Sequence, residues 1–178
     1  MKIISFKCNI LSKIHFVICI LFCFELAGCY SFTGGTIPEH LKTLSFGAIS
    51  DNSGFGNPMY REHLTKTIYD KFKRDKSYEI VESNGDARLS ISISSIIEAT
   101  STVSGSVGRQ ELETERKVTV NCDLEYYDAV KKNTIMKKNF SNFEVYKIEN
   151  SQEGRNEAIK KALEHTADDI LLAVVSGW

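Results

Sequence analysis

The sequence has few cysteines available for disulfide bonds. It contains five, and Cys8, Cys19 and Cys23 lie in the first 28 residues, which have the features of a removable leader. Cys29 follows that leader directly, so only Cys122 is left in the body of the chain. One cysteine excludes an intramolecular disulfide, and a lone free cysteine is usually a small buried apolar residue.

Neither sign of charge is in large excess. The whole chain has 22 basic and 23 acidic residues. Removing the first 28 residues takes away three lysines and one glutamate, which leaves 19 basic and 22 acidic residues and a formal net charge near −3. This balance gives no general attraction to nucleic acid, and we expect no nucleic-acid partner. Any basic site has to be local.

The motifs of catalysis and metal binding are also missing. The sequence contains no HExxH, GxGxxG or GxSxG, and His40, His63 and His165 are scattered along it. Asp168 and Asp169 are adjacent on a predicted helix, so their side chains point about 100° apart and do not form an acid–base couple. We therefore predict a non-enzymatic protein with no catalytic residue, no metal site and no cofactor.

The start of the chain has the pattern of a bacterial lipoprotein signal. Lysines at positions 2, 7 and 13 precede an apolar run, Ile14 to Phe24, that is short for a membrane span. Leu26-Ala27-Gly28 then provides the small residues of a cleavage site before Cys29. An uncleaved membrane anchor is the alternative interpretation of this segment.

Three segments follow from this signal. We predict that residues 1–28 form the signal peptide and that residues 29–40, with Gly34, Gly35 and Pro38, form a tether. We expect Cys29 to carry a diacylglyceryl group and an amide-linked acyl chain such as palmitate, because stable anchoring needs more than one chain. Residues 41–178 are left for a single domain.

The periodicity of residues 41–178 predicts an α+β domain. The predicted order is strand, helix, four strands and helix, with strands at 41–49, 78–82, around 89–94, 117–126 and 135–146. Asn57-Pro58 starts the first helix, and Asn150 with Glu153 forms a capping box for the second. The economical arrangement is a two-layer sandwich, with two helices packed on a mixed, mostly antiparallel four- to five-stranded sheet.

Each predicted element has one apolar face. The helix stripes are Tyr60, Leu64, Ile68 and Phe72, and then Ile159, Leu163, Thr166/Ala167, Ile170 and Val174, with Gly177 as a C-cap. The strand faces are Leu44, Phe46 and Ala48; Leu89, Ile91 and Ile93; and Val118, Val120, Cys122, Leu124 and Tyr126. The last predicted strand has Phe140, Phe143 and Val145 as its apolar members, with Lys137-Lys138 as an interruption. A phase shift at Ile96-Ile97 predicts a bulge or an end to burial on that face. Residues 100–108 predict a hairpin connection, Asn84-Gly85 predicts a turn, and residues 51–56 predict a loop.

Basic residues gather near the last two predicted strands. Arg116 and Lys117 open one strand, Lys131 and Lys132 lie in the following turn, and Lys137 and Lys138 lie in the next strand. If the strands pair, their ends lie near one another and could receive phosphate or carboxylate groups. The candidate anion contacts are Arg116, Lys117, Lys137 and Lys138. The alternative is that these charges keep a strand edge soluble.

The segment from Cys29 to Leu44, CYSFTGGTIPEHLKTL, resembles the start of mature LptE-family lipoproteins. The resemblance implies a non-catalytic protein that plugs the LptD β-barrel, helps it to assemble and contacts lipopolysaccharide. The implied location is the outer membrane, lipid-anchored, on the periplasmic side or within the barrel lumen. Tyr30, rather than aspartate, after Cys29 agrees with the outer membrane. The alternative function is a periplasm-facing lipoprotein adaptor that regulates an envelope enzyme or binds the cell wall.

Overall fold

The computed structural model describes residues 37–104 and 112–176. The predictions for the signal peptide, for Cys29 and for most of the tether therefore lie outside the described residues. The described elements, in chain order, are β1 (Thr43–Phe46), β2 (Ser50–Asp51), α2 (Pro58–Asp75), β3 (Glu79–Val81), β4 (Ala87–Ser104), β5 (Leu112–Asp128), β6 (Asn133–Lys147), the 3-10 turn η1 (Ile148–Asn150) and α3 (Ser151–Ser176). This order confirms the predicted one and adds a short strand, β2.

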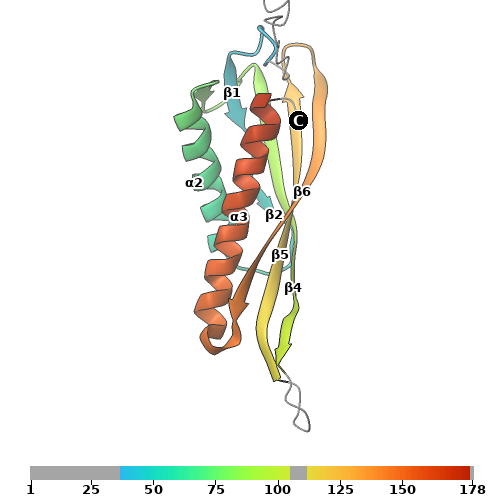
Figure 1. The fold of residues 1–178 in the computed structure, drawn as a ribbon. Coiled ribbons are helices and arrows are strands. Elements are labelled where there is room, and N and C mark those ends of the chain that lie inside the picture. The colour runs from blue at the N-terminus through green and yellow to red at the C-terminus, as the bar shows by residue number, and fades with distance from the viewer. Residues whose placement is uncertain (1–36, 105–111, 177–178) are drawn as a thin grey trace, which may run out of the picture. The chain divides into compact units, whose positions relative to one another are not determined.

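The strands form one mixed sheet in the order β3-β1-β4-β5-β6, and β2 also pairs with β4 (Figure 1). β1 runs parallel to β3 and β4, whereas β4, β5 and β6 are antiparallel neighbours. Helices α2 and α3 lie side by side on one face of this sheet. The α+β prediction of two helices on a mixed sheet is confirmed, with one strand more than expected.

Helix α2 forms as its sequence predicts. The Asn57 side chain accepts a hydrogen bond from Met59 N at 3.1 Å, and Pro58 occupies the first turn. The predicted stripe of Tyr60, Leu64, Ile68 and Phe72 is buried. The helix ends at Lys76, whose φ of 63° places a lysine in the left-handed conformation that glycine usually occupies.

Helix α3 packs its predicted stripe against β5 and β6. Ile159, Leu163, Ala167 and Ile170 are fully buried, and Val174 is 4 % exposed. The side chain of Asn150, the predicted cap, and Gly177, the predicted C-cap, lie outside the described part of the chain.

The long strands β4 and β5 confirm the predicted alternation. Leu89, Ile91 and Ile93 are buried. The bulge predicted at Ile96-Ile97 lies slightly earlier, between Ile93 and Ser95, where the pairing shifts. After the bulge, Ile96 faces the helices and Ile97 is 54 % exposed. The strand continues to Ser104, so the hairpin connection predicted from Thr100 begins later; residues 105–111 are not described.

The first predicted strand, 41–49, is interrupted, and the expectation that Ala48 shares a buried face with Leu44 is wrong. Phe46 pairs with Leu89 and Ser50 pairs with Ser92, so the first segment has one residue more than β4 between these pairs. The extra residue breaks the alternation, and Ala48 is exposed. The strand resumes as β2, where a loop was predicted.

The apolar residues of β6 divide between the two faces of the sheet. Phe140 is 7 % exposed and lies on the helix side, whereas Phe143 and Val145 are 58 % and 41 % exposed. From Met136 to Lys147, odd-numbered positions of β6 pair with odd-numbered positions of β5, which face away from the helices.

The connection between β3 and β4 passes close to β1. A Cβ atom added to Gly85 would lie 2.6 Å from Ser45 N, so this position has no room for a side chain. Ser45, next to this passage, is only 5 % exposed, and its hydroxyl donates to Ala87 O at 3.3 Å. In the predicted Asn-Gly turn, Asn84 has the positive φ, 55°, and Gly85 permits the close approach.

Candidate functional site

The sheet has one face covered by helices and a second, which we call the open face. Its residues follow from the pairing of β4, β5 and β6: Ser90, Ser92, Ser95, Ile97 and Ala99; Lys117, Thr119, Asn121, Asp123 and Glu125; and Lys137, Asn139, Ser141, Phe143 and Val145. All of these side chains are exposed or partly exposed. The open face is therefore available for interaction.

One end of the open face is polar and tied together across strands. Lys137 Nζ lies 3.2 Å from Glu125 Oε1, and Asn139 donates to Asp123 Oδ1 at 2.8 Å. The hydrogen bond from Lys137, with a second from Thr134, lowers the pKa of Glu125. These cross-strand pairs fix the polar side chains in rows.

These polar rows line a hollow of about 520 Å³. Its wall includes Ala48 from the link between β1 and β2 and Ser50 from β2, which pairs with β4. The remaining lining is Ser90, Ile91, Ser92, Asp123, Leu124, Glu125, Lys137, Lys138 and Asn139. Hydroxyl, carboxylate, amide and ammonium groups together suit a hydrated polar partner.

The other end of the open face is apolar. Ile97, Thr119 and Phe143 form one row across three strands, and Ala99, Lys117 and Val145 form the next. Lys117 Nζ lies 5.2 Å from the centroid of the Phe143 ring, a cation–π distance. Contiguous exposed apolar side chains with a polar rim are typical of protein interaction sites.

The four basic candidates do not form one cluster. Lys117 pairs with Val145 and Lys137 pairs with Glu125, so eight residues of β5 separate the two lysines. At a rise of about 3.4 Å per residue this is roughly 27 Å. The expectation that the strands are neighbours is confirmed, but the expectation that these residues lie together is wrong, because they pair at different levels of a long hairpin.

The candidates also face different sides and have partners. Arg116 and Lys138 are on the helix side, whereas Lys117 and Lys137 are on the open face. Arg116 Nη1 lies 3.5 Å from Glu98, and Lys138 Nζ lies 5.3 Å from the Phe140 ring centroid. Their role as lipopolysaccharide contacts stays a prediction.

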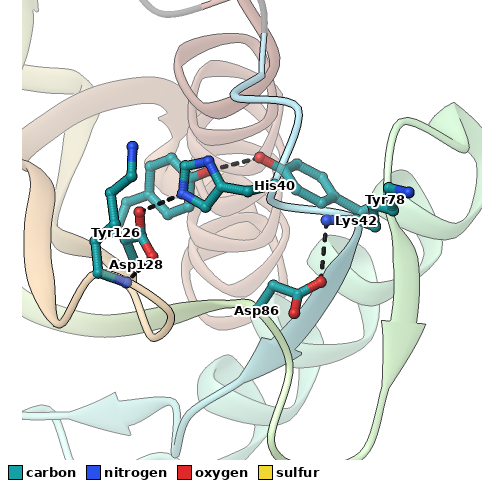
Figure 2. A network of polar contacts seen from close by, with 7 residues as sticks. His40, Lys42, Tyr78, Asp86, Tyr126 and Asp128 are labelled. Carbon is teal, nitrogen blue, oxygen red and sulfur yellow. Dashed lines mark hydrogen bonds and ion pairs between the residues drawn. The ribbon is translucent and has the colours of Figure 1, made fainter.

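A second polar cluster holds the N-terminal approach to the domain (Figure 2). His40 Nε2 lies 2.6 Å from Asp128 Oδ2, and Asp128 Oδ1 accepts from Lys131 N at 2.8 Å. Burial of Asp128 acts to raise its pKa, but the hydrogen bonds from Lys131 and His40 outweigh burial, so the pKa is lowered. We call the end of the sheet that carries this cluster the approach end.

Asp86 is the second carboxylate of the approach end. Its Oδ2 accepts from Lys42 N at 3.1 Å, from Thr43 N at 3.0 Å and from Thr43 Oγ1 at 2.9 Å. These bonds, that from Thr43 N first, lower the pKa of Asp86. Sequence reasoning missed this cluster, because His40 and Asp128 are 88 positions apart and no local pattern connects them.

Three further observations concern chemistry. In residues 37–104 and 112–176 there is no group of three or more His, Cys, Asp or Glu side chains placed to hold a metal ion. No helix in the same part of the chain is long and apolar enough to span a membrane. Cys122 is buried as predicted, and desolvation, with smaller effects of Asp123 and Asp51, raises the pKa of its thiol to about 12.

Comparison with known families decides the relationship. A family model described as LptE, lipopolysaccharide-assembly, matches residues 41–174, which is most of the chain. The chain belongs to the LptE family. The family is one of non-enzymatic lipoproteins of the Gram-negative envelope, in agreement with the resemblance seen in the sequence.

Solved structures share the LptE-like fold at low sequence identity. Rare lipoprotein B from Shewanella oneidensis is 15 % identical with a TM-score of 0.51, over 76 % of this chain and 96 % of that one. A minor lipoprotein from Acinetobacter baumannii is 11 % identical with a TM-score of 0.50, over 77 % and 94 %. A protein from Xanthomonas campestris is 12 % identical with a TM-score of 0.53, over 76 % and 85 %. No curated protein sequence matches significantly.

Proposed function

We propose that this LptE-family protein is an outer-membrane lipoprotein of lipopolysaccharide transport that plugs and supports an LptD-like β-barrel. The observation that carries the proposal is the family match over residues 41–174. In this proposal the protein is anchored by lipid on Cys29, contacts lipopolysaccharide and has no catalytic role.

The open face supports a barrel partner. Its polar rows keep their own hydrogen bonds within the sheet, so they lose little when they face a hydrated barrel wall. The apolar rows with Ile97, Phe143 and Val145 offer a dry contact at one end. A surface that is polar over most of its area and apolar at one end suits the interior of a β-barrel whose wall is mostly hydrated.

The approach end supports the role of the tether. His40 and Thr43 are fixed to the domain by Asp128 and Asp86, so a tether from Cys29 to this anchored segment is at most eleven residues long. Eleven residues span at most about 38 Å when extended. A lipid on Cys29 would therefore keep the domain close to the bilayer and raise its effective concentration near a membrane-embedded partner.

Purification of the native complex tests the partner. We expect a large β-barrel protein to co-purify with the tagged full chain from detergent-solubilised envelopes, and depletion to reduce both assembled barrel and surface lipopolysaccharide. Normal barrel assembly and normal surface lipopolysaccharide after depletion would contradict the proposal. Crosslinking to an envelope enzyme or to glycan, in place of a barrel, would favour the adaptor function.

Lipidation is tested at Cys29 itself. Cys29→Ala should release the protein from membranes, because the acyl chains attach through that thiol. Ser31→Ala, two residues further on, is the control and should leave the protein membrane-bound. Mass spectrometry of the native protein should show an acylated N-terminal cysteine; an unmodified peptide that begins at Met1 would exclude this anchor.

A further inference from the structure

The long strand β4 has a second neighbour along only part of its length. β1 pairs with β4 as far as Leu89, and β2 pairs with it as far as Ile93, whose carbonyl oxygen accepts from Asn52 N at 2.8 Å. Beyond Ile93, β5 is the only strand of residues 37–104 and 112–176 that pairs with β4 (Figure 1). From Ser95 onward, one side of β4 is therefore a sheet edge that can hydrogen-bond a further strand.

The backbone of this edge is regular over five residues. The register with β5 shifts just before Ser95 and again after Thr100. Between these two bulges, residues 95–99 pair one to one with residues 117–121 of β5. We call residues 95–99 the β4 edge. A regular segment is what an added strand requires, because a bulge interrupts the pairing and twists the edge away.

The β4 edge lacks the residues that protect strand edges from pairing. Its sequence, SIIEA, contains no lysine and no proline, and its open-face side chains are those of Ser95, Ile97 and Ala99. Ile97 is 54 % exposed. The outer strand β6, by contrast, carries exposed lysines at positions 137, 138 and 147. Of the two long edges that the described strands leave, the β4 edge is thus the unprotected one.

Glu98 is the one charged residue of the β4 edge, and its charge is balanced within the domain. Its carboxylate lies 3.5 Å from Arg116 Nη1 and 3.8 Å from Arg155 Nη1, and it accepts a hydrogen bond from Tyr146. The Glu98 side chain is 19 % exposed and lies on the helix side of the sheet. The open-face side of the β4 edge is therefore neutral, and two such edges do not repel one another there.

We propose that the protein, when no barrel is bound, forms a two-fold dimer in which the β4 edge pairs antiparallel with that of a second copy. Ile97 lies at the two-fold axis, opposite Ile97 of the second copy, and Ser95 lies opposite Ala99. A two-fold axis perpendicular to the sheet keeps the open faces of both copies on one side. The apolar row of Ile97 and Phe143 therefore continues from one copy into the other.

The side chains at this seam favour a second copy as the occupant. Neutral side chains meet on the open face, and on the helix side the two Glu98 residues are diagonal neighbours, about 7–8 Å apart. Each Glu98 keeps Arg116 and Arg155 beside it. Because the paired segments are short, the interface is small and the dissociation constant should be on the order of 10 μM. The association needs no barrel and so goes beyond the proposed function.

The mass of the lipidated full chain in density-matched detergent tests the dimer. Sedimentation equilibrium should show a monomer–dimer equilibrium that is mostly dimer at about 100 μM. Ile97→Lys places two like charges opposite one another at the axis and should weaken association about tenfold or more. Val145→Lys adds the same charge to an exposed residue of β6 on the same face, and this control should associate like the native protein.

Two results of this measurement would overturn the proposal. The first is a native protein that stays monomeric at about 100 μM. The second is equal association of Ile97→Lys and Val145→Lys. Co-purification of a barrel does not enter the measurement, so its failure is distinct from failure of the proposed function.

A disulfide distinguishes edge pairing from stacking of the open faces. Ile97→Cys places two thiols opposite one another across the axis and should give a linked dimer on mild oxidation. Phe143→Cys is as exposed and lies in the same row, but its two copies would be roughly 24 Å apart, so this control should stay monomeric. Cys122 is buried and does not compete. Equal linking of both variants, or linking of neither, would exclude the β4 edge as the seam.

Discussion

Gly85 and His40 are single residues whose roles depend on distant parts of the chain. The Asn84-Gly85 pair predicts a turn, and a turn is present, but the need for glycine arises from β1, some 40 positions earlier in the chain. The stripe residues of both helices were predictable because their spacing alone determines one face. The sequence assigns His40 to the tether, because nothing near it in the sequence indicates Asp128 as its partner.

The close approach at Gly85 makes it intolerant of a side chain. Gly85→Ala should lower the free energy of unfolding by about 1–3 kcal/mol, since the new methyl group meets the backbone of Ser45 rather than a flexible side chain. Chemical denaturation of Gly85→Ala and of Ser83→Ala, an exposed neighbour in the same connection, measures the effect. Equal stability of the two variants would contradict the close approach.

Substituting two phenylalanines of β6, one at a time, should affect stability in one case and partner binding in the other. Phe140→Ala should cost about 3–5 kcal/mol of unfolding free energy because Phe140 is 7 % exposed and packs under the helices. Phe143→Ala should change stability by less than about 0.5 kcal/mol, because Phe143 is 58 % exposed, yet reduce co-purification of the barrel. If the barrel co-purifies fully with Phe143→Ala, the apolar rows are not part of the interface.

At the scale of elements, the sequence was most informative where one element carries its own signal. α2 has a cap, a proline in its first turn and a four-residue stripe, and all three are present. The first strand was predicted as continuous because its extra residue is defined only relative to β4, more than 40 positions away. The prediction that the four basic candidates lie together was wrong for a similar reason. The register between two long strands determines which of their residues are neighbours, and the local sequence does not specify that register.

A substitution at the C-terminal end of α2 should make the protein more stable. Lys76 has a φ of 63°, which disfavours a side chain, so Lys76→Gly should raise the free energy of unfolding by up to about 1 kcal/mol. Lys73→Gly, inside the last turn, should instead lower it by about 0.5–1 kcal/mol. Urea denaturation of both variants measures the difference in sign; a loss of stability in Lys76→Gly would contradict the assigned cap.

At the scale of the whole molecule, acid should weaken the fold. The pKa values of Asp86, Asp128 and Glu125 are lowered by hydrogen bonds in the native state. A carboxylate with a lowered folded pKa stabilises the protein fully above its unfolded pKa, which is 3.8 for aspartate. That contribution is lost as the pH falls through the lower folded value.

The urea midpoint should therefore be steady from neutral pH to about pH 5 and decrease below about pH 4. Asp86→Asn should start from a lower midpoint at neutral pH and show a smaller decrease in acid, because one of the titrating groups is gone. Asp70→Asn, on the outer side of α2, is the control and should keep the native pH profile. A native slope in Asp86→Asn would show that this carboxylate does not contribute.

One strand, β5, connects the features that matter most. Asp128 at one end holds the N-terminal approach, Asp123 and Glu125 line the hollow, and Arg116 pairs with Glu98 of β4 toward the other end. The length of β5 therefore sets the distances between these features. Removing two residues from the middle of β5 would shorten it by about 7 Å and leave every remaining side chain on its own face of the sheet. Removing one residue would move every side chain beyond the deletion to the opposite face.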